Sequence, residues 1–333
     1  MAHPKPVIYT DYSDCPDFLK DFLNYQLTIR GLSARTVESY YIDLKLFFKY
    51  IKMKRTSQVD NDLIDEISIS DISFDTVKTV TQSDILEFLY FVMNERNNSA
   101  SARSRKLSSL RGFFKYYTTK VNKLDSNPCE NIEMPANKKR LPKYLTLEQS
   151  MELLSNTDTD FPQRDYCMIM LFLNCGMRIS ELVGIDVNDI VDDTMRIIGK
   201  GNKERTVYLN DGCIRAVNDY IIERNKIISP DKEPALFISK RTRKRITVRR
   251  VQQIVTGCLQ KAGLGGQGFS THKLRHTAAT LLYRSGSRDM LALKEILGHE
   301  HVSTTEIYTH ISDEELKKAA KGSPLATFKK KSK

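Results

Sequence analysis

The histidines of this sequence are concentrated near its C-terminal end. Five of the six lie between residues 272 and 310, at positions 272, 276, 299, 301 and 310. Histidine transfers protons near neutral pH and is a frequent metal ligand. His272 and His276 are four residues apart and would share one helix face, as zinc ligands do. A bound dication would repel the nearby charge of Arg275, however, and no third metal ligand occurs at a suitable spacing from these two histidines. We therefore expect no metal site here, and surface or helix-capping histidines are the plain alternative to proton transfer.

Two further patterns that suggest chemistry are better explained as loops. Gly263 to Gly268 matches G-x-G-x-x-G, but the preceding residues have a helical pattern, whereas the dinucleotide fingerprint needs a strand there. Four aspartates, at positions 186, 189, 192 and 193, would suit a metal nuclease, but a solvated loop explains them better. No G-x-x-x-x-G-K-[ST] motif occurs, which weighs against an ATP-driven motor. We therefore expect no cofactor.

A run of basic residues between Lys240 and Arg250 indicates a surface for a polyanion. It holds seven positive charges and no acid in eleven residues, and the whole chain has a net charge of +11. Such runs are usually solvated faces. Here Ile246 and Val248 interrupt the run and a helix follows, which favours a face laid along a phosphate backbone. The candidate DNA-binding residues are Arg241, Arg243, Lys244, Arg245, Arg249 and Arg250.

The length and composition indicate a folded protein of two domains. The chain has 333 residues, of which 40% are hydrophobic and 28% charged, so it can bury a core and exceeds the length of one typical domain. We find no signal peptide and no run of about 18 uncharged apolar residues. We therefore expect a cytoplasmic protein without a membrane partner. The six cysteines are widely spaced and form no C-x-x-C pair, which predicts reduced thiols in the core.

Apolar periodicity predicts the N-terminal elements. Between residues 18 and 117, four stripes with helical spacing predict four amphipathic helices in a small bundle. Residues 55–80 are polar with scattered isoleucines, and we predict an extended or irregular connection there. Prolines at positions 128, 135 and 142 and a basic cluster predict a linker, because no continuous helix can cross them.

The C-terminal part is predicted to be mostly helical with one hairpin. Thr146 to Gln149 is typical of a capping box that begins a helix, and a second helix is predicted from Arg164 to Cys175, ending at Gly176. Two strands, over residues 195–198 and 205–209, are predicted around a turn at residues 199–202. The expected fold class is mainly α with a small β-sheet (α+β). The expected domains are a helical one over 1–134, a linker over 135–145 and a second domain over 146–333.

Five short motifs follow one another along the second half of the chain. They are Gly176-Met-Arg178-Ile-Ser-Glu-Leu182, Gly199-Lys200-Gly-Asn-Lys-Glu-Arg205, His272-Lys-Leu-Arg275-His276, Leu297-Gly-His299 and Thr304-Thr-Glu-Ile-Tyr308-Thr-His310. Their order resembles that of tyrosine site-specific recombinases, most closely the bacterial Xer type and related integrases of mobile elements. The four-helix N-terminal pattern, with Gly31 to Thr36 before the second helix, is similar to the family's core-binding domain. The resemblance covers roughly residues 15 to 315 and implies a two-domain DNA clamp.

The resemblance implies roles for six residues in cutting and rejoining DNA. Tyr308 would be the nucleophile, Arg178 and Arg275 would hold the phosphate, Lys200 would be the general acid, His272 a proton-transfer partner and His299 a further phosphate donor. Spacing alone does not separate Lys200 from Lys203. Because a phosphotyrosyl ester keeps the energy of the cut bond, neither metal nor ATP would be needed. We expect the other three clustered histidines, His276, His301 and His310, to be structural.

The implied partners are a double-stranded DNA recombination site and a homotetramer formed on two such sites through a Holliday junction. A capping box at 312–315 predicts a further helix whose apolar residues would contact either a neighbouring subunit or the same one; they are Leu316, Ala319, Ala320 and Leu325. Chromosome-dimer resolution, integration or excision of a mobile element, and an accessory or directing protein all stay open. The alternatives are a type IB topoisomerase, a DNA-binding protein without catalysis and a metal nuclease.

Overall fold

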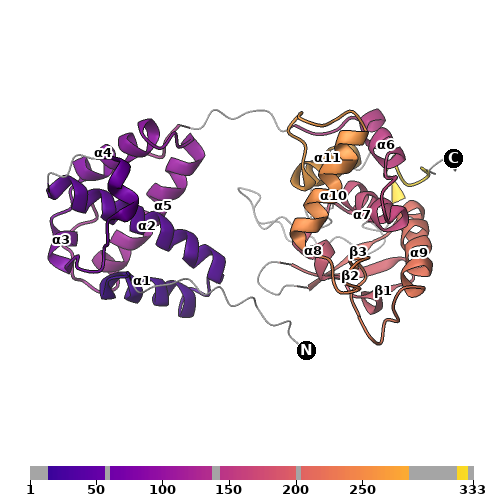
Figure 1. The fold of residues 1–333 in the computed structure, drawn as a ribbon, viewed down its shortest axis with the longest axis horizontal. Helices are drawn as coiled ribbons and strands as arrows, with labels where there is room; N and C mark the ends of the chain where they lie inside the picture. Colours follow the sequence, from indigo (N-terminus) through magenta and orange to yellow (C-terminus); the bar gives the residue numbers. More distant parts are fainter. Residues whose placement is uncertain (1–13, 57–60, 137–142, 200–203, 285–320, 329–333) are drawn as a thin grey trace, which may run out of the picture. The chain divides into compact units, whose positions relative to one another are not determined.

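The computed structural model describes residues 14–56, 61–136, 143–199, 204–284 and 321–328. The chain forms two compact units, Met1–Arg140 and Leu141–Lys333, drawn in Figure 1. No helix in the described part of the chain is long and apolar enough to cross a membrane. The same residues contain no group of three or more His, Cys, Asp or Glu side chains placed to hold a metal ion.

The first unit contains the four predicted long helices. They are α1 (Asp17–Thr28), α2 (Ala34–Arg55), α4 (Gln82–Asn94) and α5 (Ala100–Thr119). Polar side chains fix their starts: the Ser33 hydroxyl accepts a hydrogen bond from the Thr36 amide, and Thr81 forms a capping box that begins α4. Edge-to-face aromatic pairs fill the centre of this unit. The buried Tyr117 hydroxyl donates to the Phe18 carbonyl at 2.6 Å and ties α5 to α1.

The connection between α2 and α4 is more regular than the sequence suggested. It forms a 3₁₀ helix, η1 (Asn61–Glu66), and a short helix, α3 (Phe74–Lys78), so the prediction of an extended or irregular segment over 55–80 was wrong for these parts. Three of the four isoleucines that looked scattered, together with Val77, are buried in the core of the unit; they are Ile64, Ile69 and Ile72. The fourth, Ile67, is partly buried against the same core. Burial of apolar side chains therefore organises this connection, without the helical spacing that a sequence search detects.

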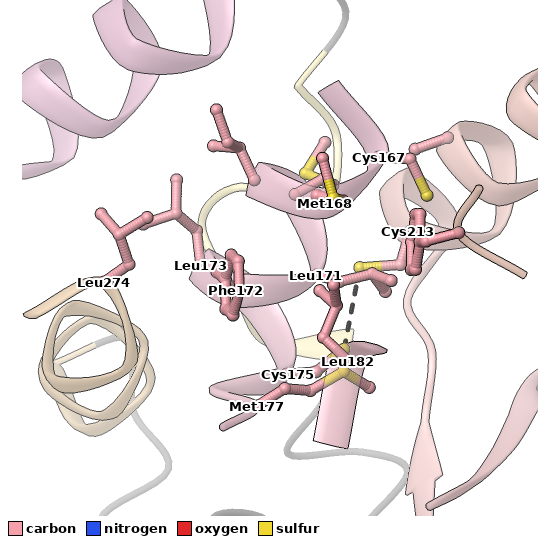
Figure 2. Close-up of a cluster of buried hydrophobic side chains, with 14 of the residues drawn as sticks. Cys167, Met168, Leu171, Phe172, Leu173, Cys175, Met177, Leu182, Cys213 and Leu274 are labelled. Carbon is pink, nitrogen blue, oxygen red and sulfur yellow. Dashed lines mark hydrogen bonds between the residues drawn. The ribbon is translucent and has the colours of Figure 1, made fainter. Parts of the chain in front are cut away.

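The second unit is built around α7 (Pro162–Cys175), in which eleven of fourteen residues are buried. The other helices in the described part of this unit are α6 (Leu147–Ser155), α8 (Ile179–Gly184), η2 (Val187–Asp189), α9 (Asp211–Asn225), α10 (Val248–Lys261) and α11 (Thr271–Arg284). The predicted capping box at Thr146 and the predicted end of α7 at Gly176 are both confirmed. Helices α9 and α11 pack on α7. Figure 2 shows this core, with Phe172 and Leu173 of α7 beside Leu274 of α11.

A small antiparallel sheet lies in the same unit. Its strands are β1 (Ile190–Val191), β2 (Thr194–Ile198) and β3 (Glu204–Tyr208), in the order β1-β2-β3. The two predicted strands are confirmed, while β1 was missed because two residues carry no periodicity. Met195 pairs with Val207, and both are buried; Ile197 pairs with Arg205. This register decides which β3 side chains face the core, because side chains alternate between the two faces.

All six cysteines are free and buried, as the sequence predicted. Cys175 and Cys213 come closest, with 4.0 Å between their sulfurs (Figure 2). A disulfide requires about 2.05 Å, so these two are core thiols. Burial raises the pKa of the Cys15 thiol, in the first unit, to about 12 and thereby keeps it in the unreactive protonated form.

Residues 321–328 pack against their own unit. Leu325 is fully buried in the same core as α7, and the Ser323 hydroxyl donates to the Asn174 side-chain oxygen at 2.5 Å. A guanidinium nitrogen of Arg215 on α9 donates to the Ala326 carbonyl at 3.2 Å. The contact expected of Leu325 is therefore made within the chain here. The predicted capping box at 312–315 and the other three apolar residues, Leu316, Ala319 and Ala320, lie outside the described residues.

Candidate active site

The turn between α7 and α8 places Arg178. Gly176 ends α7 in the left-handed region, with φ of 57°, where a side chain would add strain. Met177 is buried and anchors the turn, and Arg178 follows as the residue before α8. The Arg178 amide donates to a Glu181 carboxylate oxygen at 2.8 Å, and its guanidinium donates to the other oxygen at 2.6 Å. The carboxylate thus fixes both the backbone and the side chain of Arg178.

Helix α11 places Arg275 beside the same turn. Arg275 is 5% exposed and donates from Nη1 to the Gly176 carbonyl at 2.8 Å. The same nitrogen lies 3.8 Å from a Glu181 carboxylate oxygen. Burial lowers the pKa of the Arg275 guanidinium to about 10, with a further contribution from the charge of Arg178. Arg275 therefore stays charged at neutral pH but is held where solvation of the charge is poor, an arrangement that favours binding an anion.

Glu181 joins these groups, and the sequence did not single it out as a site residue. Its side chain is 2% exposed, and besides Arg178 and Arg275 it receives a hydrogen bond from Arg205 of β3 at 3.2 Å. One negative charge faces three positive ones, which leaves a net charge of +2 on the cluster. The signal available in the sequence was the spacing of Arg178 and Glu181, three residues apart at a helix start, which is that of a capping box.

His272 lies at the start of α11 with its side chain exposed. Its Nε2 atom lies 3.1 Å from Nε2 of His276, one turn further along the helix, and the two rings meet edge to face. A hydrogen bond between two imidazole nitrogens requires one to donate and the other to accept. The distance fits such a hydrogen bond, in which either ring could be the donor. His276, which we expected to be structural, thus contacts a predicted catalytic residue directly.

Three of the six predicted catalytic residues, Lys200, His299 and Tyr308, lie outside the described residues, as do His301 and His310. The described site therefore consists of Arg178, His272 and Arg275, with Glu181 and Arg205 beside the two arginines. Strand β2 ends at Ile198 and β3 begins at Glu204, and Lys200 lies between them in the sequence.

The basic run divides into two groups. Arg245 is engaged inside the unit: its guanidinium donates to the Asp186 carboxylate and to the Val183 and Ile185 carbonyls. Arg245 therefore ties the loop to α8, and its side chain is only partly exposed. The other five candidates have exposed side chains; they are Arg241, Arg243, Lys244, Arg249 and Arg250.

An open cavity of about 720 Å³ lies beside the run, with five basic side chains and one acidic side chain in its wall. The basic residues are Arg164, Lys240, Arg241, Arg245 and Arg250. Thr247, also in the wall, caps α10 through its hydroxyl, which accepts from the Arg250 amide. The cavity wall therefore carries an excess of positive charge at the start of a helix, a combination suited to phosphate.

The arrangement of a helical unit and a second, mostly helical unit with a small sheet is the fold of solved two-domain site-specific recombinases. The phage integrase family matches residues 143–315, and the N-terminal SAM-like domain of phage integrases matches residues 18–122. The chain belongs to the phage integrase family, and it is a Xer-like tyrosine site-specific recombinase. The resemblance stated from the motifs and the expected fold class are both confirmed, and the topoisomerase and non-catalytic alternatives are not favoured.

Two relatives and two solved structures illustrate the similarity. The chain is 48% identical over 311 residues to tyrosine recombinase XerC of Caldanaerobacter subterraneus subsp. tengcongensis, covering 93% of this chain and 88% of the relative. It is 31% identical over 306 residues to tyrosine recombinase XerD of Listeria monocytogenes serotype 4b, covering 90% and 96%.

Among structures, the XerH recombinase bound to palindromic difH substrate, a post-cleavage complex, aligns with a TM-score of 0.67 at 23% identity, covering 91% of this chain and 94% of that one. The lambda integrase tetramer bound to a Holliday junction aligns with a TM-score of 0.63 at 16% identity, covering 88% and 79%. At these identities the alignments show a shared fold.

Proposed function

We propose that this recombinase cuts one DNA strand by attack of the Tyr308 hydroxyl on a phosphodiester held by Arg178 and Arg275. The observation that carries the proposal is the convergence of these two arginines on Glu181, because it leaves an excess of positive charge at a partly buried site. Each guanidinium presents a planar fork of donors that matches the non-bridging oxygens of a phosphate. Removing either would cost roughly 3 to 4 kcal/mol of transition-state stabilisation, as with other preorganised donors.

Proton transfer completes the reaction. A phenol has a pKa of about 10, so Tyr308 must lose its proton as it attacks, and His272 is the proposed acceptor, supported by its hydrogen bond with His276. The bond between phosphorus and the 5′ oxygen breaks as the tyrosyl bond forms, and Lys200 is proposed to protonate that leaving oxygen. His299 is proposed as a further donor to the phosphate. The product is a 3′-phosphotyrosyl ester and a free 5′ hydroxyl.

The reaction is proposed to need neither metal nor ATP. The phosphotyrosyl ester conserves the phosphodiester, so attack by a 5′ hydroxyl of the other duplex reverses the step and reseals the strand. The positive charge that a metal would supply comes from Arg178 and Arg275, with the nearby charge of Arg205. Exchange of one strand pair gives a Holliday junction, and exchange of the second pair resolves it.

Binding of duplex DNA is proposed to use both units. In the second unit the exposed residues of the basic run and the adjoining cavity would contact the phosphate backbone, while Arg245 supports the loop from inside. The first unit, with the boundary of 1–134 and a linker over 135–145, is proposed as the core-binding domain that holds the other side of the duplex. The solved relatives bound to difH substrate and to a core site support DNA as the partner.

The active assembly is proposed to be a homotetramer on two DNA sites, supported by the tetramer of lambda integrase on a Holliday junction. The enzyme would work in the bacterial cytoplasm, on the nucleoid. Chromosome-dimer resolution and movement of a mobile element use the same chemistry, so the DNA site that reacts distinguishes them.

The test uses suicide duplexes that carry candidate sites from the protein's own genome and a nick close to the cut. They are incubated with the protein in EDTA and without ATP, and covalent adducts are separated on a denaturing gel. Adducts are expected with the wild-type protein and absent with Tyr308→Phe, which should bind the same duplex with unchanged affinity. Adducts that persist in Tyr308→Phe would overturn the assignment of the nucleophile, and adducts that require added Mg²⁺ would overturn metal independence.

A further inference from the structure

Arg205 of β3 contacts the buried carboxylate of Glu181. The two proposed phosphate-binding arginines contact the same carboxylate from other elements, Arg178 from the start of α8 and Arg275 from α11. Arg205 pairs with Ile197 across β2 and β3, and this register turns its side chain to the same face as the buried Val207. The side chain is 18% exposed, and Nη2 lies 3.2 Å from Oε2 of Glu181. Burial lowers the pKa of Arg205, and the charge of Glu181 opposes that shift. Arg205 is therefore a cation placed inside the unit against one specific carboxylate.

Arg205 donates to Oε2 of Glu181, and the other two arginines also interact with this oxygen. Oε2 accepts the Arg178 amide at 2.8 Å and lies 3.8 Å from Nη1 of Arg275. A carboxylate can rotate about its last torsion unless partners occupy both oxygens. Arg178 donates to Oε1 from its guanidinium and to Oε2 from its amide, and Arg205 donates to Oε2 from the side of the sheet. Loss of Arg205 would leave Oε2 with the Arg178 amide and the charge of Arg275 but without a partner on the sheet side. The carboxylate would then shift toward Arg275, which would change the positions of both phosphate-binding groups.

The contact also joins the sheet to α8. Arg205 is the second residue of β3, next to Glu204 where that strand begins. The hydrogen bond to Glu181 therefore fixes the start of β3 relative to the turn that carries Arg178. One contact therefore holds the start of β3 beside the phosphate-binding pair. Lys200, the proposed general acid, precedes β3 in the sequence.

We propose that Arg205 is a positioning residue of the recombination reaction. Through Glu181 it fixes the orientation of the Arg178 and Arg275 side chains, and it fixes β3 beside them. The proposal rests on the proposed function, since the orientation of these two arginine side chains affects the rate only if they bind the reacting phosphate. A misplacement of about 1 Å in such groups costs up to roughly 100-fold in rate. Arg205 acts through the carboxylate, so its removal should slow cleavage with little effect on DNA affinity.

Arg196 supplies the matched control. It lies on the neighbouring strand β2, but its side chain is 57% exposed and pairs with Asp189 at 2.7 Å and with Glu204 at 3.7 Å. Arg196→Gln removes the same charge from the same sheet without touching Glu181. It therefore separates a general loss of positive charge from loss of the specific contact.

The first experiment measures single-turnover adduct formation on the nicked duplex that reacts with the wild-type protein, at saturating protein, and the Kd of the same duplex. For Arg205→Gln we expect the rate to fall by roughly 10-fold to 100-fold while the Kd changes by less than about threefold. Arg205→Lys should recover part of the rate, and Arg196→Gln should match wild type. In a Glu181→Gln background, Arg205→Gln should add less than about threefold, because the two residues act as one unit. A wild-type rate in Arg205→Gln, or full additivity with Glu181→Gln, would overturn the proposal.

A second measurement does not depend on any DNA site. Nε–Hε signals of Arg178 and Arg275 are recorded by NMR in the full chain, and both should shift in Arg205→Gln but not in Arg196→Gln. Unmoved signals in both variants would overturn the positioning role even if cleavage were slowed. If the wild-type protein formed no adduct on any candidate site, the proposed function would fail, and these signals would still decide whether Arg205 sets the two arginines.

Discussion

Arg275 donates a hydrogen bond to the carbonyl of Gly176 at 2.8 Å, so the residue that ends α7 also holds an arginine of α11 that is proposed to bind phosphate. Gly176 has φ of 57°, and only glycine adopts this conformation without strain. The direction of its carbonyl, and hence the position of Arg275, depends on that conformation. The backbone of the α7–α8 turn therefore does two things at once: it leads the chain into Arg178 and it anchors Arg275.

Gly176→Ala should weaken both stability and catalysis. A side chain in the left-handed region costs roughly 1 to 2 kcal/mol, and relief of that strain would rotate the carbonyl away from Arg275. Hydrogen exchange followed by mass spectrometry should show lower protection in peptides from α7 and α11, and adduct formation on the reacting duplex should slow. Gly257→Ala, within α10 and with open space around the added carbon, serves as the control and should leave both unchanged or slightly improved.

Arg275→Lys should be a strong catalytic defect although it conserves charge. An ammonium group is a compact charge without the planar fork, so it cannot serve the Gly176 carbonyl and two phosphate oxygens together. We expect the adduct rate to fall by roughly 100-fold or more, with the unfolding transition nearly unchanged. Arg284→Lys, at the exposed end of the same helix, where Arg284 contacts Tyr144, should retain the wild-type rate. Equal rates for the two variants would show that Arg275 contributes only its charge.

Local patterns predicted much of the fold, and distant contacts account for what they missed. The capping box at Thr146 and the hairpin of β2 and β3 depend on residues that are close together in the sequence, and both predictions are confirmed. The role of Glu181 depends on Arg205, 24 residues away, and on the β2–β3 register that turns Arg205 inward. No single-sequence pattern contains that information, because it arises only when α8 and the sheet meet.

The basic run illustrates the same limit within one motif. By composition all of its arginines were equal candidates for DNA contact. Arg245 differs because Asp186, 59 residues earlier in the chain, binds it from inside the unit. The prediction for the connection over 55–80 failed for a related reason. Its buried isoleucines lie in η1 and in the segment between η1 and α3, so their spacing follows tertiary packing rather than a helix period.

Asp43 should be a major determinant of stability in the first unit. Its side chain is 1% exposed and accepts hydrogen bonds from Lys106 at 2.9 Å and Ser109 at 3.0 Å, with Arg105 as a third partner. Asp43→Ala would leave the buried Lys106 ammonium without its counter-charge, which costs roughly 3 to 5 kcal/mol. Hydrogen exchange in peptides of α2 and α5 should report that loss. Asp71→Ala, which removes an exposed partner of Lys52, should change protection by less than about 1 kcal/mol.

Asp14 should make the stability of the first unit depend on acid pH. Burial raises the pKa of its carboxyl, but hydrogen bonds from Ser68, Lys45 and the Ile69 amide outweigh that effect and lower the pKa from 3.8 to about 2. Because the folded pKa is depressed, the stabilisation is fully present above about pH 4 and is lost as the pH falls toward 2. The shift corresponds to about 2 kcal/mol at neutral pH.

Asp14→Asn is the variant that tests this dependence. At pH 7 it should lower the unfolding free energy of the first unit by about 2 kcal/mol or somewhat less, since Asp14 is partly exposed. The difference from wild type should shrink between pH 4 and pH 2, because the wild-type carboxyl becomes neutral there as well. Thermal unfolding followed by circular dichroism across this range measures both curves. A difference that stays constant down to pH 2 would mean that Asp14 stabilises the unit by packing or by neutral hydrogen bonds, and that its charge contributes nothing.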